Sequence, residues 1–552
     1  MSRWEHEADV VVVGAGGAAL AAAVAALEEG ATVVLLEAGE VPGGTTRSSG
    51  GAFWIPNNTL MRAAGVEDPR EDALRLMARL SYPSLYDPDA PFLGIGEHAH
   101  ALLAAYYDEA SPAIDTLMAL GAIDAIILPS LGASPSPVSD PDYHAELPEN
   151  KAPYGRVLTA VTPAGAMAWP GQFLAEGLAA HVTGRGARIL TGHRVTGVRT
   201  NGRGDVTGVE FEHGGRSGAV RAKRGVVFAT GGFAHDPEKV LAHLRGPVFG
   251  SGSVATGTGV FLDIATQLGA KLGNLANGFY YQVALEELVQ NGGTVQNPFT
   301  HCFLPYGDSM VLVNKYGERC VNEKAMYHVR AQSHFQWAGT EYPNLVQFLI
   351  YDQAVAEEPT FWPWRGCVPL PGMEAPWVVR GESLEELAAG VSAKLETLRG
   401  VRAGSGVVGP DVRLAADIVA TLRATIERFN TFATSGVDAD FQRGETPIQP
   451  AWQGPSRGAP NRTMHPIDLD GPLYCVPLAA AVLDTCGGPV IGPDARVVRV
   501  DGTPIGGLYG AGNCVAGPVG QGYWGAGGTI GPALTFGFVA GRNAAREGQR
   551  PE

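Results

Sequence analysis

The chain has 552 residues, of which 45% are hydrophobic and 17% charged, as in an ordinary globular protein with a large core. Its formal net charge of −16 argues against a nucleic-acid partner, because binding to phosphate needs clustered lysines and arginines. The six cysteines form no C-x-x-C pair and no zinc-like spacing, so we expect a reduced chain without a structural metal.

The first nine residues lack the basic region and the cleavage site of a signal peptide. No segment offers about 18 uninterrupted apolar residues, the length that a membrane-spanning helix needs. We therefore expect a cytoplasmic protein that does not span a membrane.

A dinucleotide-binding pattern opens the chain. Residues 9–13 are typical of a buried strand, and an alanine-rich helix to Glu29, a second strand over 32–36 and the acid Glu37 follow. The acid would bind the adenosine ribose hydroxyls, and it disfavours a 2′-phosphate. Between strand and helix, glycines make the tight turn and let a pyrophosphate approach, and a small residue packs the helix on the sheet. The residues expected to contact the cofactor here are Gly14, Gly16, Gly17, Ala18, Ala19 and, after the acid, Ala38.

A second loop rich in glycine and hydroxyl side chains follows at residues 43–58, where a nicotinamide-only fold would need no further phosphate loop. FAD-linked folds place such a loop against the flavin. Its candidate cofactor contacts are Gly44, Thr45, Thr46, Ser49, Gly50 and Gly51. Residues 60–125 read as helices. Residues 128–155, which include Tyr143 and His144, read as a long loop, and loops of that length tend to be functional.

Short strands are expected next, and turn signals separate them. We expect a small antiparallel layer from residues 188–190, 195–198, 209–212 and 219–221. A further buried strand begins at residue 226. It ends in the candidate adenosine-side contacts Thr230 and Gly231, and a helix is expected from about 259 to 268.

The composition changes at about residue 279, where aromatic residues and prolines increase. We expect a cofactor domain made of residues 1–278 and 458–552, with residues 279–457 inserted. Within the insert, residues 310–314 and 345–351 favour strands, and residues 384–398 and 414–434 favour amphipathic helices. The fold class is thus α/β: a discontinuous Rossmann-like FAD-binding domain with an inserted α+β catalytic (cap) domain.

One aromatic segment of the insert, residues 361–364, suggests an interfacial role. Together with Val368, Leu370 and Trp377 it could form an apolar lip that touches a membrane surface peripherally. The alternative is a packed core cluster.

The C-terminal part resumes short strands after Tyr474 and then enters a stretch with nine glycines between Gly510 and Gly531. Pro532 is suited to the first turn of the helix that follows. The N-terminus of a helix favours negative charge, which suits the edge of a flavin that becomes anionic on reduction. The candidate flavin contacts in this stretch are Gly512, Asn513, Gly528 and Ile530, and Tyr523 lies where a flavin substrate would be.

Over nearly its whole length the chain resembles the FAD-dependent 3-ketosteroid dehydrogenases, relatives of the fumarate reductase flavoproteins. The resemblance rests on residues 45–58, on 317–323 followed by Tyr327, on 429–444 and on 523–537. It implies an external electron acceptor and a 3-ketosteroid substrate.

The resemblance also implies a role for each of four residues. Tyr327 would remove a proton from C2 of the steroid, while Tyr523 and the N–H of Gly527 would bind the C3 carbonyl oxygen. Tyr143 would hydrogen-bond the base. These types suit the chemistry, because a proton beside a ketone is weakly acidic and two donors at the carbonyl oxygen stabilise the developing charge. A hydride from C1 then passes to flavin N5.

Three alternatives stay open. The first is desaturation at another position of the same substrate, as in Δ4-(5α) dehydrogenases. The second is a fumarate-reductase-like ene-reductase, which needs an arginine proton donor, and Arg330 is the candidate. The third is a flavin-binding protein without turnover. The preferred steroid, the electron acceptor, the oligomeric state and covalent attachment of the flavin are not fixed by the sequence.

Overall fold

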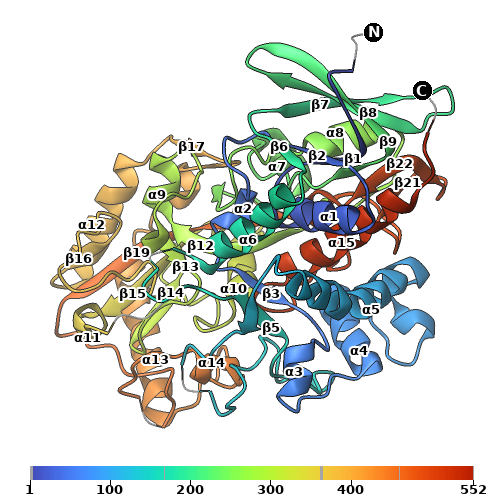
Figure 1. The fold of residues 1–552 in the computed structure, drawn as a ribbon. Coiled ribbons are helices and arrows are strands. Elements are labelled where there is room, and N and C mark those ends of the chain that lie inside the picture. The colour runs from blue at the N-terminus through green and yellow to red at the C-terminus, as the bar shows by residue number, and fades with distance from the viewer. Residues whose placement is uncertain (1–3, 133, 167, 361–364, 459, 551–552) are drawn as a thin grey trace.

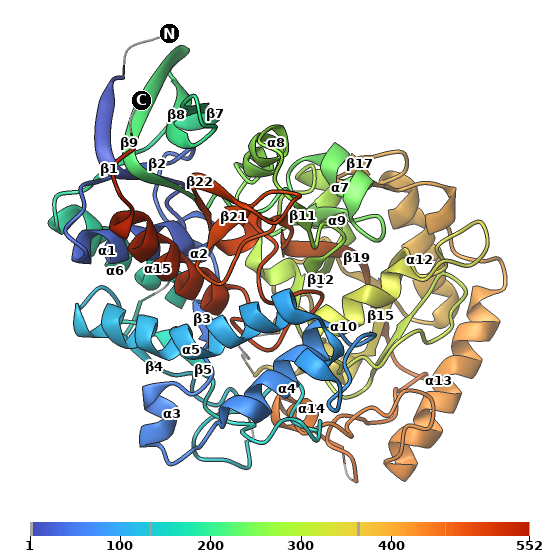
Figure 2. The same ribbon diagram turned by 90° about the vertical axis from the view of Figure 1, so that its right-hand side faces the viewer.

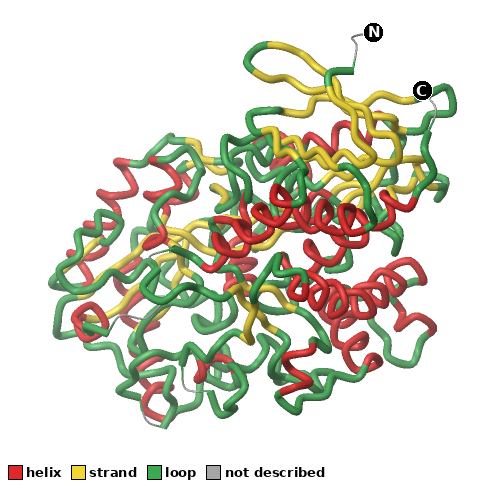
Figure 3. The backbone as a smooth tube through the Cα atoms, in the orientation of Figure 1, coloured by secondary structure: helices red, strands yellow, loops and turns green. Residues whose placement is uncertain are grey.

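The computed structural model describes residues 4–132, 134–166, 168–360, 365–458 and 460–550. Two large sheets and the helices around them make up the molecule, one sheet beside both chain ends and the other on the opposite side (Figures 1 and 3). The mixed α/β class expected from the sequence is confirmed.

The first sheet has the strand order β21-β22-β9-β1-β2-β6. Two further strands extend it, because β8 pairs with β9 and β7 pairs with β8. Its strands are β1 (His6–Val13), β2 (Val33–Leu36), β6 (Arg188–Leu190), β7 (Arg194–Thr200), β8 (Val206–His213), β9 (Arg216–Phe228), β21 (Arg496–Val498) and β22 (Pro504–Gly510). The central strand β1 runs parallel to both of its neighbours, and its second half is buried, as the apolar run predicts. Strands from both ends of the chain therefore share one sheet.

Helices α1 (Gly17–Glu28) and α15 (Ile530–Arg546) pack side by side on this sheet (Figure 2). Two glycines of α15 permit the close approach. A Cβ on Gly537 would lie 2.2 Å from the carbonyl oxygen of Ala18, and one on Gly541 would lie 1.9 Å from that of Ala22. The packing fixes the start of α15 against the start of α1.

Two expectations for this sheet are wrong. β6 pairs in parallel with β2 and does not belong to the antiparallel layer. The strands expected at 219–221 and from 226 are one 13-residue strand, β9, whose first half pairs with β8 and whose second half pairs with β1. The polar pair Lys223–Arg224 hides this continuity in the sequence.

The second sheet has the order β13-β12-β19-β15-β14, and β10 and β16 also pair with β19. Its strands are β10 (Gly250–Ser251), β12 (Gly278–Ala284), β13 (His301–Cys302), β14 (Met310–Val313), β15 (Val346–Asp352), β16 (Val379–Gly381) and β19 (Leu473–Thr485). β19 has 13 residues, so the expectation of only short strands after Tyr474 is wrong. Although residues 458–552 are assigned to the cofactor domain by sequence, β19 pairs with strands of the insert. The domain boundaries themselves stay a prediction.

Helices α12 and α13 of the insert lie on the side of the molecule away from the chain ends (Figure 2). The predicted helix 384–398 is α12, and the one predicted from 414 begins four residues later as α13. The insert helices are α9 (Leu285–Gln290), α10 (Tyr327–Ala331), α11 (Gln353–Glu357), α12 (Leu384–Thr397), α13 (Ile418–Ser435) and α14 (Ile448–Ala451).

The remaining elements connect the two sheets. The helices are α2 (Gly44–Arg47), α3 (Thr59–Ala63), α4 (Arg70–Ser81), α5 (Glu97–Ala119), α6 (Pro170–Gly184), α7 (Pro237–His243) and α8 (Val260–Gln267). The strands are β3 (Ala52–Trp54), β4 (Ala125–Ile127), β5 (Val157–Ala160), β11 (Leu272–Gly273), β17 (Arg402–Ala403), β18 (Gly406–Val407) and β20 (Gly488–Pro489). The helices expected over 60–125 and after residue 259 are confirmed.

The proposed apolar lip is not supported where the structure describes it. Residues 361–364 lie outside the described residues. Val368 and Trp377 are buried in a core cluster, and the indole N–H of Trp377 donates to the carbonyl of Cys367 at 2.9 Å. These two side chains therefore belong to the packed alternative. Among the described residues no helix is both long and apolar enough to cross a membrane, and no group of three or more potential ligands is arranged to hold a metal.

Candidate active site

The loop between β1 and α1 is built from glycines that let main-chain groups approach one another closely. Gly14 has φ +105°, and a Cβ there would lie 2.5 Å from the carbonyl oxygen of Ala229. Gly16 is the N-cap of α1 and bridges to Gly43 of the second loop, where Gly44 also has a positive φ. The N-cap Gly16 makes no side-chain cap and the Thr46 hydroxyl accepts only from the N–H of Gly17, so the next N–H groups of the first turn are available to an anion. Two glycine loops thus face one another at the start of a helix.

Glu37 lies buried at the end of β2. Its carboxylate accepts hydrogen bonds from the backbone N–H groups of Ala15 and Gly39, both at 2.7 Å. Burial raises its pKa, and these donors oppose the shift. An acid at this place, followed by Ala38, suits the predicted contact with ribose hydroxyls.

The hydroxyls of the second loop are engaged by the protein itself. Thr46 accepts from the N–H of Gly17 at 3.1 Å, Thr45 accepts from the N–H of Val254 at 3.2 Å, and Ser49 donates to the carbonyl of Thr46. Gly51 is required by packing, because a Cβ there would lie 2.3 Å from the backbone nitrogen of Gly171. These contacts fix the loop against α1 and α6, whereas the predicted contact Gly50 is exposed.

Thr230 and Gly231 follow β9 and lie beside Asp484, a buried carboxylate that the sequence analysis missed. Asp484 accepts from the N–H of Gly232 and from the side-chain amide of Asn513, both at 3.0 Å. Burial raises its pKa. Asp484 therefore links the end of β9 to residues 511–529, the loop between β22 and α15, which we call the C-terminal loop. It also orients Asn513.

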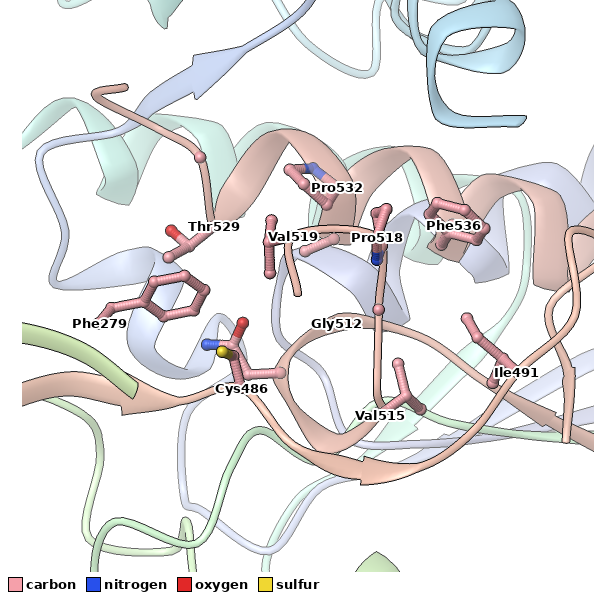
Figure 4. Close-up of a pocket in the computed structure, with 14 residues that line it drawn as sticks. Phe279, Cys486, Ile491, Gly512, Val515, Pro518, Val519, Thr529, Pro532 and Phe536 are labelled. Carbon is pink, nitrogen blue, oxygen red and sulfur yellow. The ribbon is translucent and has the colours of Figure 1, made fainter. Parts of the chain in front are cut away.

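A small pocket lies between this loop and the start of α15 (Figure 4). Three predicted flavin contacts, Gly512, Asn513 and Gly528, line it, and Phe279 and Cys486 from the second sheet's side do as well. Ile530 is the first residue of α15, whose N-cap Thr529 makes no side-chain cap. In the first turn of α15 the N–H groups of Gly531 and Ala533 donate to the carbonyls of Gly527 and Thr529, and Pro532 has no N–H, so at most the N–H of Ile530 is left for a ligand.

Three predicted tyrosines meet although they lie far apart in the chain. The hydroxyl of Tyr143, from the loop between β4 and β5, donates to that of Tyr327 at 3.2 Å. The hydroxyls of Tyr327, at the start of α10, and Tyr523, in the C-terminal loop, are 2.7 Å apart. All three side chains are buried. The structure therefore brings Tyr143, Tyr327 and Tyr523 into one hydrogen-bonded chain.

Burial controls the acidity of these phenols. It raises the pKa of Tyr143 and Tyr327 well above the ordinary value. It raises the pKa of Tyr523 only to about 12, because the Tyr327 hydroxyl and the backbone N–H of Gly527 interact with the Tyr523 oxygen and lower it. Gly527 has φ +81°, and a Cβ there would lie 2.4 Å from Phe53. The Gly527 N–H and the Tyr523 hydroxyl thus lie close together.

Aromatic rings wall this site. Phe279 lies 5.4 Å from Tyr523, Phe303 lies 5.1 Å from Tyr327, and Trp452 lies 5.4 Å from Tyr143, measured between ring centroids. These three are residues that the sequence analysis missed, since no motif distinguishes them from core aromatics.

His328, also missed, lies 5.6 Å from Tyr523, measured between ring centroids. Its Nδ1 accepts from the backbone N–H of Tyr280, and burial lowers its pKa to about 3. The imidazole is therefore neutral, and it adds no charge to the site.

Comparison with known proteins agrees with this geometry. A family model described as FAD binding domain matches residues 9–530. The chain belongs to the FAD binding domain family. It is an FAD-dependent oxidoreductase, and the glycine loops, the buried acid and the start of α1 fit FAD.

Its relatives include two dehydrogenases, each 29% identical over 97% of this chain. One is the 4-oxocyclohexanecarboxylate 2-dehydrogenase of Sinomonas cyclohexanicum, of which 92% is covered, and the other is the 3-oxosteroid 1-dehydrogenase of Mycobacterium tuberculosis, of which 97% is covered. A solved structure of 3-ketosteroid delta1-dehydrogenase from Sterolibacterium denitrificans matches with a TM-score of 0.79 at 23% identity, over 98% of this chain and 99% of that one. This last likeness shows the fold.

Arg330, the candidate proton donor of an ene-reductase, is occupied elsewhere in this oxidoreductase. Its guanidinium is fully buried and donates to the side chain of Gln282 and to the carbonyls of Cys302, Phe303 and Ala325. Arg330 therefore holds the backbone behind Tyr327.

Proposed function

We propose that this oxidoreductase dehydrogenates a 3-ketosteroid and introduces a double bond between C1 and C2. The observation that carries the proposal is the hydrogen-bonded chain of Tyr143, Tyr327 and Tyr523 inside a buried, aromatic site. The name of the 3-oxosteroid 1-dehydrogenase relative, which covers nearly the whole chain, supports the substrate class.

Each residue has one task in the proposed reaction. The Tyr523 hydroxyl and the Gly527 N–H bind the C3 carbonyl oxygen and stabilise the charge that develops there, an effect of several kcal/mol in a dry site, about 3 for one donor. This makes the C2 proton more acidic, and the Tyr327 oxygen accepts it. Tyr143 donates to that oxygen and orients it. FAD, when bound, accepts the hydride from C1.

The surroundings of the tyrosines favour an uncharged ketone. Their ring neighbours are Phe279, Phe303, Trp452 and the neutral His328, which suit a hydrocarbon skeleton. The engagement of Arg330 with backbone carbonyls argues against the fumarate-reductase-like alternative. The Δ4-(5α) alternative would use the same flavin and a similar carbonyl clamp, so product analysis must separate it from the Δ1 reaction.

The proposal also includes an electron acceptor and a location for the enzyme. The reduced flavin must pass two electrons on, so we include an external electron acceptor. We also propose a cytoplasmic enzyme, and contact with a membrane surface is proposed only for the segment around residues 361–364.

The test is anaerobic incubation of the purified protein with androst-4-ene-3,17-dione and an artificial electron acceptor. We expect bleaching of the flavin absorbance and a product that has lost two hydrogens at C1 and C2, as located by NMR. The same incubation with 4-oxocyclohexanecarboxylate tests the smaller ring ketone. Turnover of that acid alone would overturn the steroid assignment, a double bond elsewhere would overturn the position, and an unbleached flavin would overturn catalysis.

A further inference from the structure

Arg156 lies just before β5 and is completely buried with two carboxylates. Its Nε and Nη2 donate to the carboxylate of Asp68 at 2.9 and 2.7 Å, and its Nη1 donates to that of Asp142 at 2.6 Å. The side chains of Arg156 and Asp68 have no exposed surface, and that of Asp142 is 4% exposed. Burying charges is expensive and such pairs often add little net stability, so a cluster of this kind suggests a role in placement.

At one end, the cluster binds the residues that flank Tyr143 in the chain. Asp142 precedes Tyr143, and its carboxylate binds Arg156 Nη1. The same Nη1 donates to the side-chain oxygen of Asn150 at 2.8 Å, and the Asn150 amide donates to the carbonyl of His144 at 3.2 Å. The residues before and after Tyr143 are thus attached, directly and through Asn150, to one guanidinium nitrogen.

The other end of the cluster reaches the carbonyl-binding donors. The Arg156 guanidinium lies 5.3 Å from the centre of the Trp54 ring. The backbone N–H of Trp54 donates to the carbonyl of Gly527 at 3.1 Å, and its ring lies 5.4 Å from that of Trp524, the neighbour of Tyr523. Trp54 therefore connects Arg156 to the loop that carries both proposed donors.

We propose that Arg156, with Asp68 and Asp142, is a positioning residue that sets Tyr143 and the Tyr523–Gly527 loop relative to Tyr327. The inference rests on the proposed function, because it assigns the tyrosines their roles in the reaction. A displacement of about 1 Å in a reacting geometry can cost about 10²-fold in rate, so the cluster has enough influence to matter.

The first test removes the contact to the Tyr143 loop. In Asp142→Ala and in Asn150→Ala we expect FAD content to stay near that of the parent, while flavin reduction by a ketosteroid slows by about 10- to 100-fold at saturation. Asp142→Asn keeps a hydrogen-bond acceptor and should recover most of the rate. The matched control is Glu109→Ala, which removes the carboxylate partner of Arg542 between α5 and α15 and should stay within about two-fold.

A double-mutant cycle then separates positioning from general destabilisation. If Asp142 acts through Tyr143, Asp142→Ala should cost little in rate once Tyr143→Phe is present, whereas a merely structural effect should add to that of Tyr143→Phe in full. Full additivity overturns the inference. If Asp142→Ala fails to fold, the cycle is run with Asn150→Ala, which removes no charge.

Failure of this inference differs from failure of the proposed function. Normal reduction rates in both Asp142→Ala and Asn150→Ala, alongside a slow Tyr327→Phe, would overturn the role of Arg156 alone. A Tyr327→Phe variant that reduces its flavin at the parent rate would overturn the assigned reaction, and with it the basis for positioning.

Discussion

The cofactor loops and the tyrosine centre are built in opposite ways. Around the dinucleotide loop the chain presents backbone: Gly14 and Gly44 at positive φ, the bridge from Gly16 to Gly43, and an uncapped helix start. At the tyrosine centre it presents side chains, and three hydroxyls meet from segments 184 and 196 residues apart. The loops that fit the cofactor are thus shaped mainly by main chain, whereas the proposed chemistry depends on a few side-chain oxygen atoms.

This difference predicts where single substitutions act. Removing one oxygen from a tyrosine leaves the ring packed and should change the rate of reaction. Adding one carbon to a cofactor glycine should change stability or FAD binding. The predictions below follow this contrast, beginning with the largest effect.

Tyr327→Phe should give the largest loss. The ring remains packed against Phe303, but the proposed base is gone, so flavin reduction by a ketosteroid should fall by about 10² to 10⁴, the range for a general base. FAD content and steroid affinity should change little. Stopped-flow reduction with steroid titrations measures both quantities, and a rate within a few-fold of the parent would make another residue the base.

The pH dependence is the control for this variant. Burial raises the pKa of Tyr327, so only a small fraction of the phenolate is present at neutral pH, and the fraction grows about tenfold per pH unit below that pKa. The reduction rate of the parent should therefore rise with pH through the neutral and mildly alkaline range. In Tyr327→Phe the rise should be absent.

The cofactor region was largely predictable because its signals are local. Strand, glycine loop, helix, strand and acid follow one another within residues 6–37, and each has its own period or residue type. Two strands of this sheet were predicted wrongly, because their pairing depends on residues that are not visible in the local sequence. β6 joins β2 across residues 37–187, and β9 continues through a polar pair that reads as a break.

The tyrosine centre was predictable only in part, and for another reason. Tyr327, Tyr523 and Gly527 came from a resemblance, and Tyr143 came from that resemblance and a long loop. The residues around them could not be read from local pattern, because their partners are remote: Arg156 and Asp68 are 88 residues apart, and Trp452 and Asp140 are 312 apart. Each is a polar or aromatic residue whose role depends on the folded chain.

Tyr523→Phe should lower the reduction rate somewhat less than the base variant does. It removes one of two donors at the carbonyl oxygen, which is worth about 10²- to 10³-fold in rate, while the Gly527 N–H remains. Steroid binding should weaken as well, because the ground-state carbonyl also loses a hydrogen bond. A lowered rate with unchanged steroid affinity would contradict the assignment of Tyr523 to the carbonyl oxygen.

Gly14→Ala tests the backbone side of the comparison and should have the smallest effect on the reaction itself. The added Cβ meets the carbonyl oxygen of Ala229 at 2.5 Å in a residue with φ +105°, so the folded protein should lose about 1–3 kcal/mol and release FAD more readily. The matched control is Gly30→Ala, which also has a positive φ, +76°, but no atom within 4 Å of the added carbon. This control has the unfavourable backbone conformation but no close contact, and it should lose about 1 kcal/mol of folding stability.

Thermal unfolding and FAD retention on gel filtration compare the two variants. The Gly14→Ala molecules that keep FAD should be reduced by the steroid at nearly the parent rate. Equal losses in both variants would show that the approach to Ala229 contributes nothing, and a slow reduction in FAD-loaded Gly14→Ala would show that the two regions are coupled.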